Sequence, residues 1–354
     1  MELAQPFKYF STLHNMNTKP AKFLFGIIGS PLGHTASPLL HTWAFAKMNL
    51  AAAYYSWPLQ PEHLPSFVQA IRLLPIHGVS VTIPFKQVII PYLDGLDNLA
   101  TKIGAVNTLY WDAGKLKGTN TDVLGFIYPL RKLKVKPKIA LVLGAGGAAR
   151  GVLAGLRLIS QETQIFIANR SFNKAQILAE EFNAQALPWP ASLAIKQGLK
   201  PDLVINTSPM GMQGSESQAE SPLSLKDFKD LHVGEQSSRH YGEGISSLPL
   251  AYDLVYRPLH TPFLQFAKQA GWQTQDGLDM LLGQGLEQLN IWTGQPSGQA
   301  NTQTMNQITG QAPNQTPSQT PNQTPNQAPE HPKLSLPSVC QARRESGILK
   351  FIST

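Results

Sequence analysis

The chain has 354 residues, enough for two domains with sizeable hydrophobic cores. Its formal net charge is +7, but lysines and arginines are scattered, so the charge does not indicate a nucleic-acid partner. No apolar run is long enough to span a bilayer and no signal-peptide pattern is seen, so we expect no membrane partner. Cys340 is the sole cysteine, which excludes an internal disulfide and favours a cytoplasmic protein.

Apolar runs and turn residues divide the chain into alternating strands and helices. After a polar extension (1–22), the first part is predicted to contain strands at 23–29, 53–57 and 78–83, helices from Ser37 and at 62–74, and a hairpin of 103–110 with 115–118. We expect Ser37 to cap its helix, with Pro38 at the first helical position.

The second part opens with a helix at 123–133. It is predicted to continue with strands at 139–143, 164–168, 203–206 and 250–256 and helices at 148–158, 175–182, 261–270 and 277–292. Alternating strands and helices predict an α/β fold with parallel strands. Residues 213–248 give no secure assignment.

A glycine-rich turn joins the strand at 139–143 to its helix. The turn consists of Gly144, Ala145, Gly146, Gly147 and Ala148. Glycines let the backbone approach a phosphate, and the helix N-terminus offers free N–H groups and a positive dipole end. This order favours a dinucleotide site. The alternative is a turn that uses glycine for steric reasons alone.

The residues after the next strand indicate which dinucleotide binds. An NAD site usually has an acid there, about twenty residues after the glycine turn. This strand ends instead in Asn169, Arg170 and Ser171, with Lys174 a turn later. Positive charge and a hydroxyl suit the 2′-phosphate of NADP, so we expect NADP. Ordinary polarity at a helix start is the alternative.

Lys86 and Asp122 are the candidate catalytic residues. Each follows the end of a predicted element, where ligands gather in open α/β sheets. A lysine beside apolar strands can exchange protons near neutral pH. Taken alone, Lys86 reads as a surface lysine and Asp122 as an acid at a helix start. Together they form a possible proton-transfer pair at the domain junction.

Several neutral polar residues are candidates for hydrogen bonds to a polyhydroxylated ligand. They are Thr35, Ser37, Thr82, Asn107 and Gln284. Each has a structural alternative as a cap, a strand hydroxyl, a turn amide or a solvated helix residue. No spacing of His, Asp or Glu favours a metal site.

The last segment, 295–354, has near-repeats of Thr-Pro-Asn-Gln and is predicted to be disordered because it has too little apolar area to offset its ordering entropy. A short apolar cluster (Ile348, Leu349, Phe351 and Ile352) leaves a partner-binding role open.

Nine short motifs, in order, resemble the shikimate dehydrogenase family. They are GHTASP (33–38), VTIPFK (81–86), GAVNT (104–108), GTNTD (118–122), GAGGA (144–148), NRS (169–171), NTSPMG (206–211), YDLVY (252–256) and GLDML (277–281). The resemblance covers roughly 23–294. It implies reversible, NADPH-dependent reduction of 3-dehydroshikimate to shikimate, a step of chorismate and aromatic amino-acid biosynthesis.

The resemblance also implies an architecture and a set of site residues. It implies a substrate-binding catalytic domain (23–122, completed by a returning helix at 277–294), a Rossmann-type NADP-binding domain (123–276) and a monomer or homodimer. Lys86 and Asp122 match the catalytic residues. The implied substrate contacts are Thr35, Ser37, Thr82, Asn107, Asp122, Tyr256 and Gln284. The implied cofactor contacts are residues 144–148 and 169–174, Leu254 and Gly277.

Some positions depart from the family pattern. Thr35 stands where serine is usual, Ser80 where asparagine is usual, and Asn98 where an acid is frequent. Residues 235–247 read as an insertion, and the tail has no family counterpart. Two alternatives stay open: a quinate/shikimate dehydrogenase of broader specificity, and a non-catalytic paralogue that binds shikimate and NADP. Arg170 argues against a preference for NAD.

Overall fold

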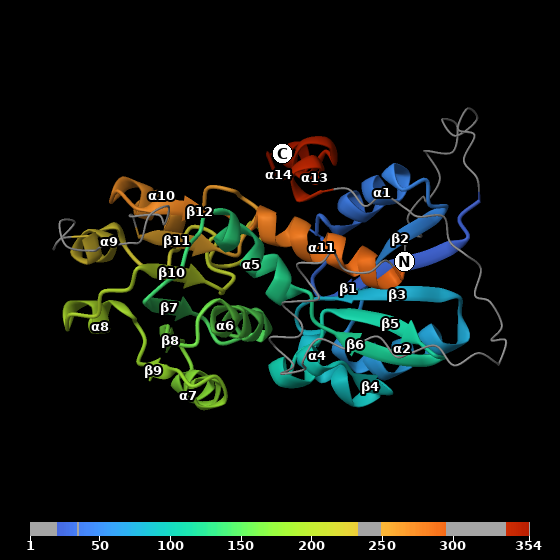
Figure 1. Cartoon of the computed structure of the whole chain (residues 1–354), viewed down its shortest axis with the longest axis horizontal. Helices are drawn as coiled ribbons and strands as arrows, with labels where there is room; N and C mark the ends of the chain where they lie inside the picture. Colours follow the sequence, from blue (N-terminus) through green and yellow to red (C-terminus); the bar gives the residue numbers. More distant parts are fainter. Residues whose placement is uncertain (1–19, 34, 233–248, 295–337, 354) are drawn as a thin grey trace, which may run out of the picture.

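The computed structural model describes residues 20–33, 35–232, 249–294 and 338–353, and shows two α/β domains side by side (Figure 1). Each domain is built around one six-stranded sheet. Helices α5 (Asp122–Lys132) and α11 (Leu278–Trp292) lie between the two sheets and pack against each other. The predicted two-domain α/β fold is confirmed.

The first sheet has the strand order β2-β1-β3-β5-β6-β4. The first three strands run parallel, whereas β5 and β6 form the antiparallel hairpin. β1 lies between β2 and β3, which fits its nearly unbroken apolar sequence because both of its faces are covered. The elements are β1 (Phe23–Gly29), α1 (Ser37–Lys47), β2 (Ala52–Pro58), η2 (Pro61–His63), α2 (Leu64–Leu73), β3 (Ile76–Val81), α3 (Phe85–Val88), η3 (Ile90–Tyr92), β4 (Gly95–Leu96), α4 (Asn98–Ile103), β5 (Thr108–Asp112) and β6 (Lys115–Thr119).

The second sheet is wholly parallel, with the strand order β12-β11-β10-β7-β8-β9. Its order reverses at β7, whose neighbours are β8 and β10. Ligands of open parallel sheets bind at such a switch point, beyond the carboxyl ends of the strands. The elements are β7 (Ile139–Leu143), α6 (Gly147–Ile159), β8 (Gln164–Ala168), α7 (Phe172–Glu181), β9 (Gln185–Leu187), α8 (Ser192–Lys196), β10 (Leu203–Asn206), α9 (Leu225–His232), β11 (Leu250–Asp253), α10 (Pro262–Gln269) and β12 (Gln273–Gln275).

The predicted cap of the first helix and the predicted start of the hairpin are wrong. Ala36, not Ser37, occupies the N-cap of α1, and no side chain caps that helix. The Ser37 side chain is instead engaged by the neighbouring Thr35 hydroxyl. The hairpin strand begins at Thr108 rather than at 103, because α4 extends to Ile103 and residues 104–107 connect the helix to the strand. Asp97 caps α4 by accepting the Ala100 N–H at 2.7 Å.

The predicted strand at 250–256 ends early, at Asp253. The Val255 N–H bonds to the Asp253 carboxylate at 3.0 Å instead of continuing the ladder. Residues 254–256 therefore form a loop at the carboxyl end of the sheet. Part of the segment that gave no assignment forms α9, and the suspected insertion at 235–247 lies outside the described residues.

The prediction of a disordered tail is wrong for residues 338–353. They form α13 (Val339–Glu345) and α14 (Ile348–Ser353), which pack above α11 near α1 (Figure 1). Ala342 and Ile348 are fully buried in one apolar cluster with residues of α1, β1 and α11. Burial of these few apolar side chains stabilises the two helices. The composition of the tail as a whole is too polar to indicate it. Residues 295–337 and 354 lie outside the described residues.

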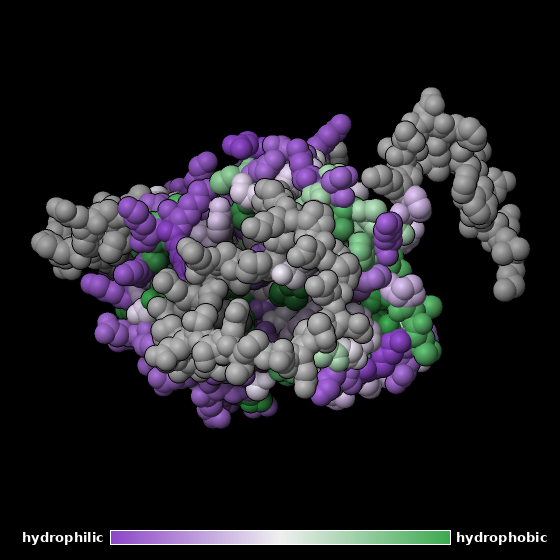
Figure 2. Space-filling view, turned by 45° about the vertical axis from the view of Figure 1, so that its right-hand side comes forward, coloured by the Kyte–Doolittle hydropathy of each residue, from purple (hydrophilic) through white to green (hydrophobic). Residues whose placement is uncertain are grey.

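None of the described helices is long and apolar enough to cross a membrane. On the face shown in Figure 2, hydrophilic residues are spread around the molecule rather than gathered in one patch.

Close packing of α5 fixes how the two domains meet. A Cβ on Gly125 of α5 would lie 2.6 Å from the Met280 carbonyl oxygen of α11. On its other side, a Cβ on Gly155 of α6 would lie 2.6 Å from the Phe126 ring. Glycine at both contacts therefore lets α5 approach α6 and α11 more closely than any side chain would allow.

Asp253 ties three segments together at the carboxyl edge of the second sheet. Its carboxylate accepts hydrogen bonds from the Asn206 amide (3.0 Å), the Val255 N–H (3.0 Å) and the Thr261 hydroxyl (2.6 Å). The side chain is fully buried, and burial raises the pKa of Asp253 from 3.8 to about 7 despite these donors.

Gly125→Ala is expected to lower the free energy of unfolding by about 1–3 kcal/mol, because the added methyl forces α5 and α11 apart. This loss should outweigh the gain in helix propensity of roughly 1 kcal/mol. Denaturant unfolding measures the change. Gly95→Ala is the control, since a Cβ there meets nothing within 4 Å. Unchanged or higher stability of Gly125→Ala would contradict this packing.

Asp253→Asn is expected to flatten the dependence of Tm on pH between about 4 and 8. The folded state holds the Asp253 proton more tightly than the unfolded chain does. The resulting stability is fully present below about pH 4 and is lost as the pH rises through about 7. Asparagine cannot ionise, so the variant should lose less Tm over this range than the wild type. The exposed Asp230→Asn serves as control and should follow the wild type.

Candidate active site

Lys86 and Asp122 form an ion pair at the junction of the two domains. The Lys86 Nζ lies 2.5 Å from the Asp122 Oδ2, with side-chain exposures of 14% and 6%. Lys86 lies on α3, just after β3, and Asp122 is the first residue of α5, just after β6. The predicted proximity of the two residues is confirmed by this contact. Such an enclosed pair can hold and pass a proton next to a bound ligand.

Asn107 orients the carboxylate of this pair. Its Nδ2 donates to the Asp122 Oδ1 at 2.9 Å, while its own Oδ1 accepts the Thr121 N–H at 2.8 Å. Gln284 of α11 approaches from the other side, with its Oε1 3.3 Å from the Asn107 Nδ2. Three of the predicted site residues therefore meet in one hydrogen-bonded group with Lys86.

A buried amide behind this group, Gln288, was missed at the sequence level. Its Nε2 donates to the Asn107 carbonyl oxygen (3.1 Å) and to the Thr108 hydroxyl (3.0 Å). Its Oε1 accepts from Ser80 (2.8 Å) and lies 3.2 Å from the His41 Nε2. Gln288 is 1% exposed. The signal that could have found it is its spacing from Gln284, four residues apart on one helix face.

The same hydrogen-bond network continues to Ser37, at the end of the loop between β1 and α1. The Tyr54 hydroxyl donates to Ser80 at 2.7 Å and also bonds with the Ser37 side chain. Burial lowers the pKa of His41 to about 3, so the imidazole stacked on the Tyr54 ring is neutral. Ser80, one of the departures from the family pattern, is thus a structural link between Tyr54 and Gln288.

At the loop between β1 and α1, the side chains of Thr35, Ser37 and Tyr256 come together. The Thr35 hydroxyl lies 3.2 Å from the Ser37 Oγ. Tyr256, from the loop after β11, hydrogen-bonds with the Thr35 side chain and the Ala36 backbone, and burial raises its pKa. The second domain therefore contributes a side chain to the loop of the first. Thr82, half-buried after β3, lies against Gly29.

The glycine-rich turn lies directly against the Lys86–Asp122 pair. Gly144 has φ +118°, a conformation that favours glycine, and a Cβ on Gly146 would meet nothing within 4 Å. A Cβ on Gly147, at the start of α6, would lie 3.4 Å from the Lys86 Cβ, and one on Gly151 would lie 3.1 Å from the Asp122 Cβ. The open helix N-terminus and the ion pair are therefore neighbours.

The remaining predicted cofactor residues lie along the same edge of the second sheet. Arg170 and Lys174 are exposed beyond β8, and the Gly144 N–H bonds to the Ala168 carbonyl oxygen, so the glycine turn is adjacent. Leu254 and Gly277 touch each other: a Cβ on Gly277 would lie 2.1 Å from the Leu254 carbonyl oxygen. No contact joins Arg170 or Lys174 to the Lys86 group among the described residues.

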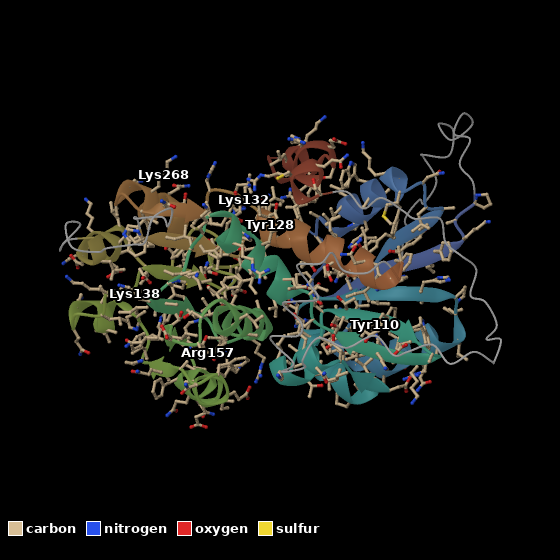
Figure 3. All side chains as sticks on the ribbon, viewed as in Figure 1. Tyr110, Tyr128, Lys132, Lys138, Arg157 and Lys268 are labelled. Atoms are coloured by element: carbon tan, nitrogen blue, oxygen red, sulfur yellow. The ribbon has the colours of Figure 1, made fainter. Side chains whose placement is uncertain are left out.

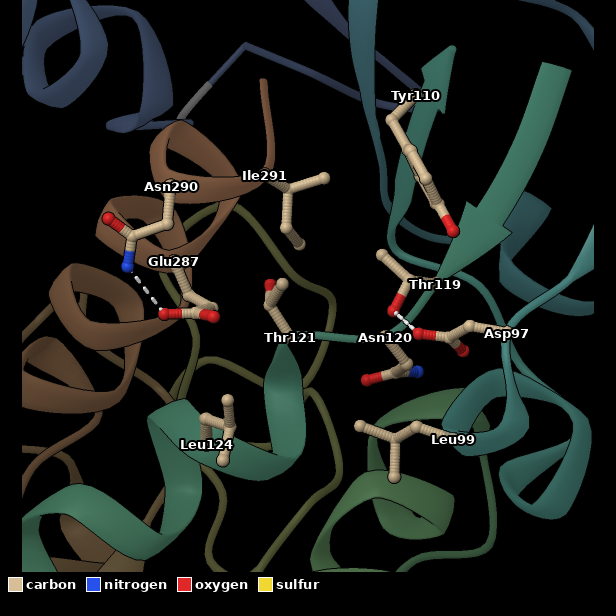
Figure 4. A pocket seen from close by; sticks show the side chains of 10 residues that line it. All are labelled: Asp97, Leu99, Tyr110, Thr119, Asn120, Thr121, Leu124, Glu287, Asn290 and Ile291. Carbon is tan, nitrogen blue, oxygen red and sulfur yellow. Dashed lines mark hydrogen bonds between the residues drawn. The ribbon is translucent and has the colours of Figure 1, made fainter. Parts of the chain in front are cut away.

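A separate pocket of about 190 Å³ adjoins the site through Asn120 and Thr121 (Figure 4). Its two carboxylates already have partners: Asp97 accepts the Thr119 hydroxyl, and Glu287 accepts the Asn290 amide at 2.7 Å. The lining residues are Asp97, Leu99, Tyr110, Thr119, Asn120, Thr121, Leu124, Glu287, Asn290 and Ile291. None of them is a predicted substrate or cofactor contact. The described residues contain no group of three or more His, Cys, Asp or Glu side chains placed to hold a metal.

Two parts of the chain match models of protein domains, and the chain is similar to many individual proteins. Residues 27–109 match the shikimate dehydrogenase substrate binding domain, and residues 277–305 match the shikimate 5'-dehydrogenase C-terminal domain. Shikimate dehydrogenase (NADP(+)) of Oleidesulfovibrio alaskensis is 46% identical, over 77% of this chain and 90% of the relative. The enzyme of the same name from Maridesulfovibrio salexigens is 43% identical, over 78% and 93%.

Solved structures agree with the sequence relatives. The crystal structure of shikimate 5-dehydrogenase from Thermus thermophilus, in complex with NADP(H) and shikimate, is 32% identical with a TM-score of 0.64. The likeness covers 81% of this chain and 99% of that one. With two domains of this fold, the ion pair at their junction and relatives identical at 40% or more over nine-tenths of their length, the chain belongs to the shikimate dehydrogenase family.

Proposed function

We propose that this chain catalyses the reversible, NADPH-dependent reduction of 3-dehydroshikimate to shikimate. The observation that carries the proposal is the contact between the Lys86–Asp122 pair and the start of α6. A group bound at the glycine turn would react next to a residue pair able to hold a proton. The relatives' names supply the substrate and cofactor.

The residues of the glycine turn fit a dinucleotide phosphate. The positive φ of Gly144 and the open space beside Gly146 leave the backbone N–H groups at the start of α6 accessible. Arg170, Ser171 and Lys174, with Asn169, would hold the 2′-phosphate of NADP, since they stand beyond the strand next to the turn. Leu254 and Gly277 would border the nicotinamide end.

The substrate would lie between the Lys86–Asp122 pair and the loop that joins β1 to α1. Thr35, Ser37 and Tyr256 present hydroxyls suited to a carboxylate, while Thr82, Asn107 and Gln284 can bond to ring hydroxyls. NADPH, when bound at the glycine turn, would supply the hydride for the carbonyl carbon. Lys86 would give a proton from its ammonium group to the carbonyl oxygen, and in the reverse direction its neutral amine would take the proton from the hydroxyl of shikimate, while Asp122 keeps the lysine in place. Asn107 holds the Asp122 carboxylate toward Lys86 throughout.

We infer a cytoplasmic protein, monomeric or homodimeric. The sole cysteine fits a reducing compartment. We also place the boundary between the substrate domain (23–122, with the returning helix at 277–294) and the NADP domain (123–276) at α5, whose first residue belongs to the catalytic pair.

Assays of shikimate or quinate, each with NADP or NAD, test the proposal and its alternatives. Oxidation of shikimate with NADP should be the fastest reaction. Comparable kcat/KM for quinate would indicate the broader enzyme, and binding of shikimate and NADP without turnover would indicate the non-catalytic paralogue. Either result would overturn the proposed specificity.

Lys86→Ala is expected to lower kcat roughly 10²–10⁴-fold, because the proton donor is removed, while KM for shikimate changes less. Steady-state kinetics measures both constants. Lys115→Ala, at an exposed position of the hairpin, is the control and should keep the wild-type kcat. A Lys86→Ala enzyme with normal kcat would exclude Lys86 from proton transfer.

Arg170→Ala is expected to raise KM for NADP about tenfold and to leave KM for NAD nearly unchanged, since only NADP carries the 2′-phosphate. Kinetics with both cofactors on the same preparation provides the comparison. An equal change for NAD and NADP would place Arg170 away from the 2′-phosphate.

A further inference from the structure

The two C-terminal helices contact both domains and the helices between them. Ile348 is fully buried among side chains of α1, β1 and α11, and Tyr256 packs against the same cluster. The Cys340 sulfur lies 3.8 Å from the hydroxyl of Tyr128, which stands on α5 (Figure 3). On α1, Lys47 pairs with Glu345 at 2.6 Å. A short segment therefore touches α1, α5 and α11 at once.

Arg343 of α13 binds the turn that leads into α11. Its guanidinium donates to the Asp276 carboxylate at 3.1 Å and, more closely, to the Asp279 carboxylate. Asp279 is 5% exposed. The two acids flank Gly277, which packs against Leu254. Arg343 thus holds the 276–279 turn, which borders the proposed binding site of the nicotinamide.

Phe351 of α14 makes the second contact near the site. The Arg257 guanidinium lies over its ring, 4.4 Å from the centroid. Arg257 follows Tyr256, the residue that reaches the Thr35 side chain, and its Nε donates to the Gln213 side chain at 2.6 Å. The C-terminal segment therefore also contacts the loop that carries a proposed substrate residue.

We propose that residues 338–353 act as an intramolecular clamp that fixes the 254–257 loop and the 276–279 turn in the arrangement that binds substrate, with Arg343 as its principal positioning residue. This inference rests on the proposed function. Fixing these segments in advance lowers the ordering cost of binding, so the clamp acts on substrate affinity more than on the chemical step. Residues 295–337 connect the clamp to α11 in the chain.

Charge gives Arg343 a second effect. Asp276 and Asp279 place two carboxylates close to the site of an anionic substrate and an anionic cofactor. Arg343 pairs with both, so removing it leaves two uncompensated negative charges there. The resulting repulsion is screened by salt, which a purely structural loss of packing would not be.

The test compares four full-length variants: Arg343→Ala, Arg343→Lys, Ile348→Asp and the control Arg344→Ala. Arg344 is the exposed neighbour, so its replacement changes the same charge without touching the turn. Arg343→Ala should raise KM for shikimate about three- to tenfold with little change in kcat, and added salt should reduce the difference. Arg343→Lys should recover part of the loss, and Arg344→Ala should match the wild type.

Docking is measured independently of activity through Cys340. A fluorescent maleimide attached to this sole cysteine reports the mobility of α13 by anisotropy. Ile348→Asp buries a charge in the apolar cluster and should lower the anisotropy and raise KM for shikimate together.

Four results would overturn the clamp. They are unchanged anisotropy in Ile348→Asp, a fall in anisotropy with unchanged KM, equal effects of Arg343→Ala and Arg344→Ala, and an Arg343→Ala effect that salt does not alter. A wild type that turns over no shikimate would instead contradict the proposed function, and the anisotropy would still report whether the segment docks.

Discussion

The ion pair between Lys86 and Asp122 is the interaction on which the rest of the site depends. Both side chains are largely removed from water, so each charge is tolerated because the other and the Asn107 amide stand beside it. The pair also requires two strands of the first sheet that end at the same edge, since Lys86 follows β3 and Asp122 follows β6. A site of this kind exists only when the sheet, α5 and α6 are all in place.

Behind the pair, neutral hydrogen bonds hold the geometry. Gln288 lies 181 residues after Asn107 in the sequence and contacts its backbone directly. Helix α11, which follows the second sheet in the chain, thereby packs against the first sheet. Neutral groups suit this position because they add no charge near Lys86 and Asp122, and a fully bonded amide keeps its partners in one arrangement.

Local signals predicted much of this molecule. The glycine turn after β7, the parallel strands and the pairing of Lys86 with Asp122 follow from patterns within a few residues and from the rule that strand ends share one edge. The contacts among Tyr54, Ser80 and Gln288 join three distant segments, and no local pattern encodes them. The C-terminal helices were missed because so short a helix is not stable alone and forms through burial of Ala342 and Ile348.

Three glycines on α6 fix the spacing of the side chains that pack against this helix. Gly147 faces Lys86, Gly151 faces Asp122 and Gly155 faces Phe126, each four residues or about 6 Å further along the helix. The distances from the start of α6 to Lys86 and to Asp122 are therefore set by the rise of the helix and not by loop conformation. Loops around this site can change in length or sequence while the spacing between the start of α6 and the Lys86–Asp122 pair stays the same.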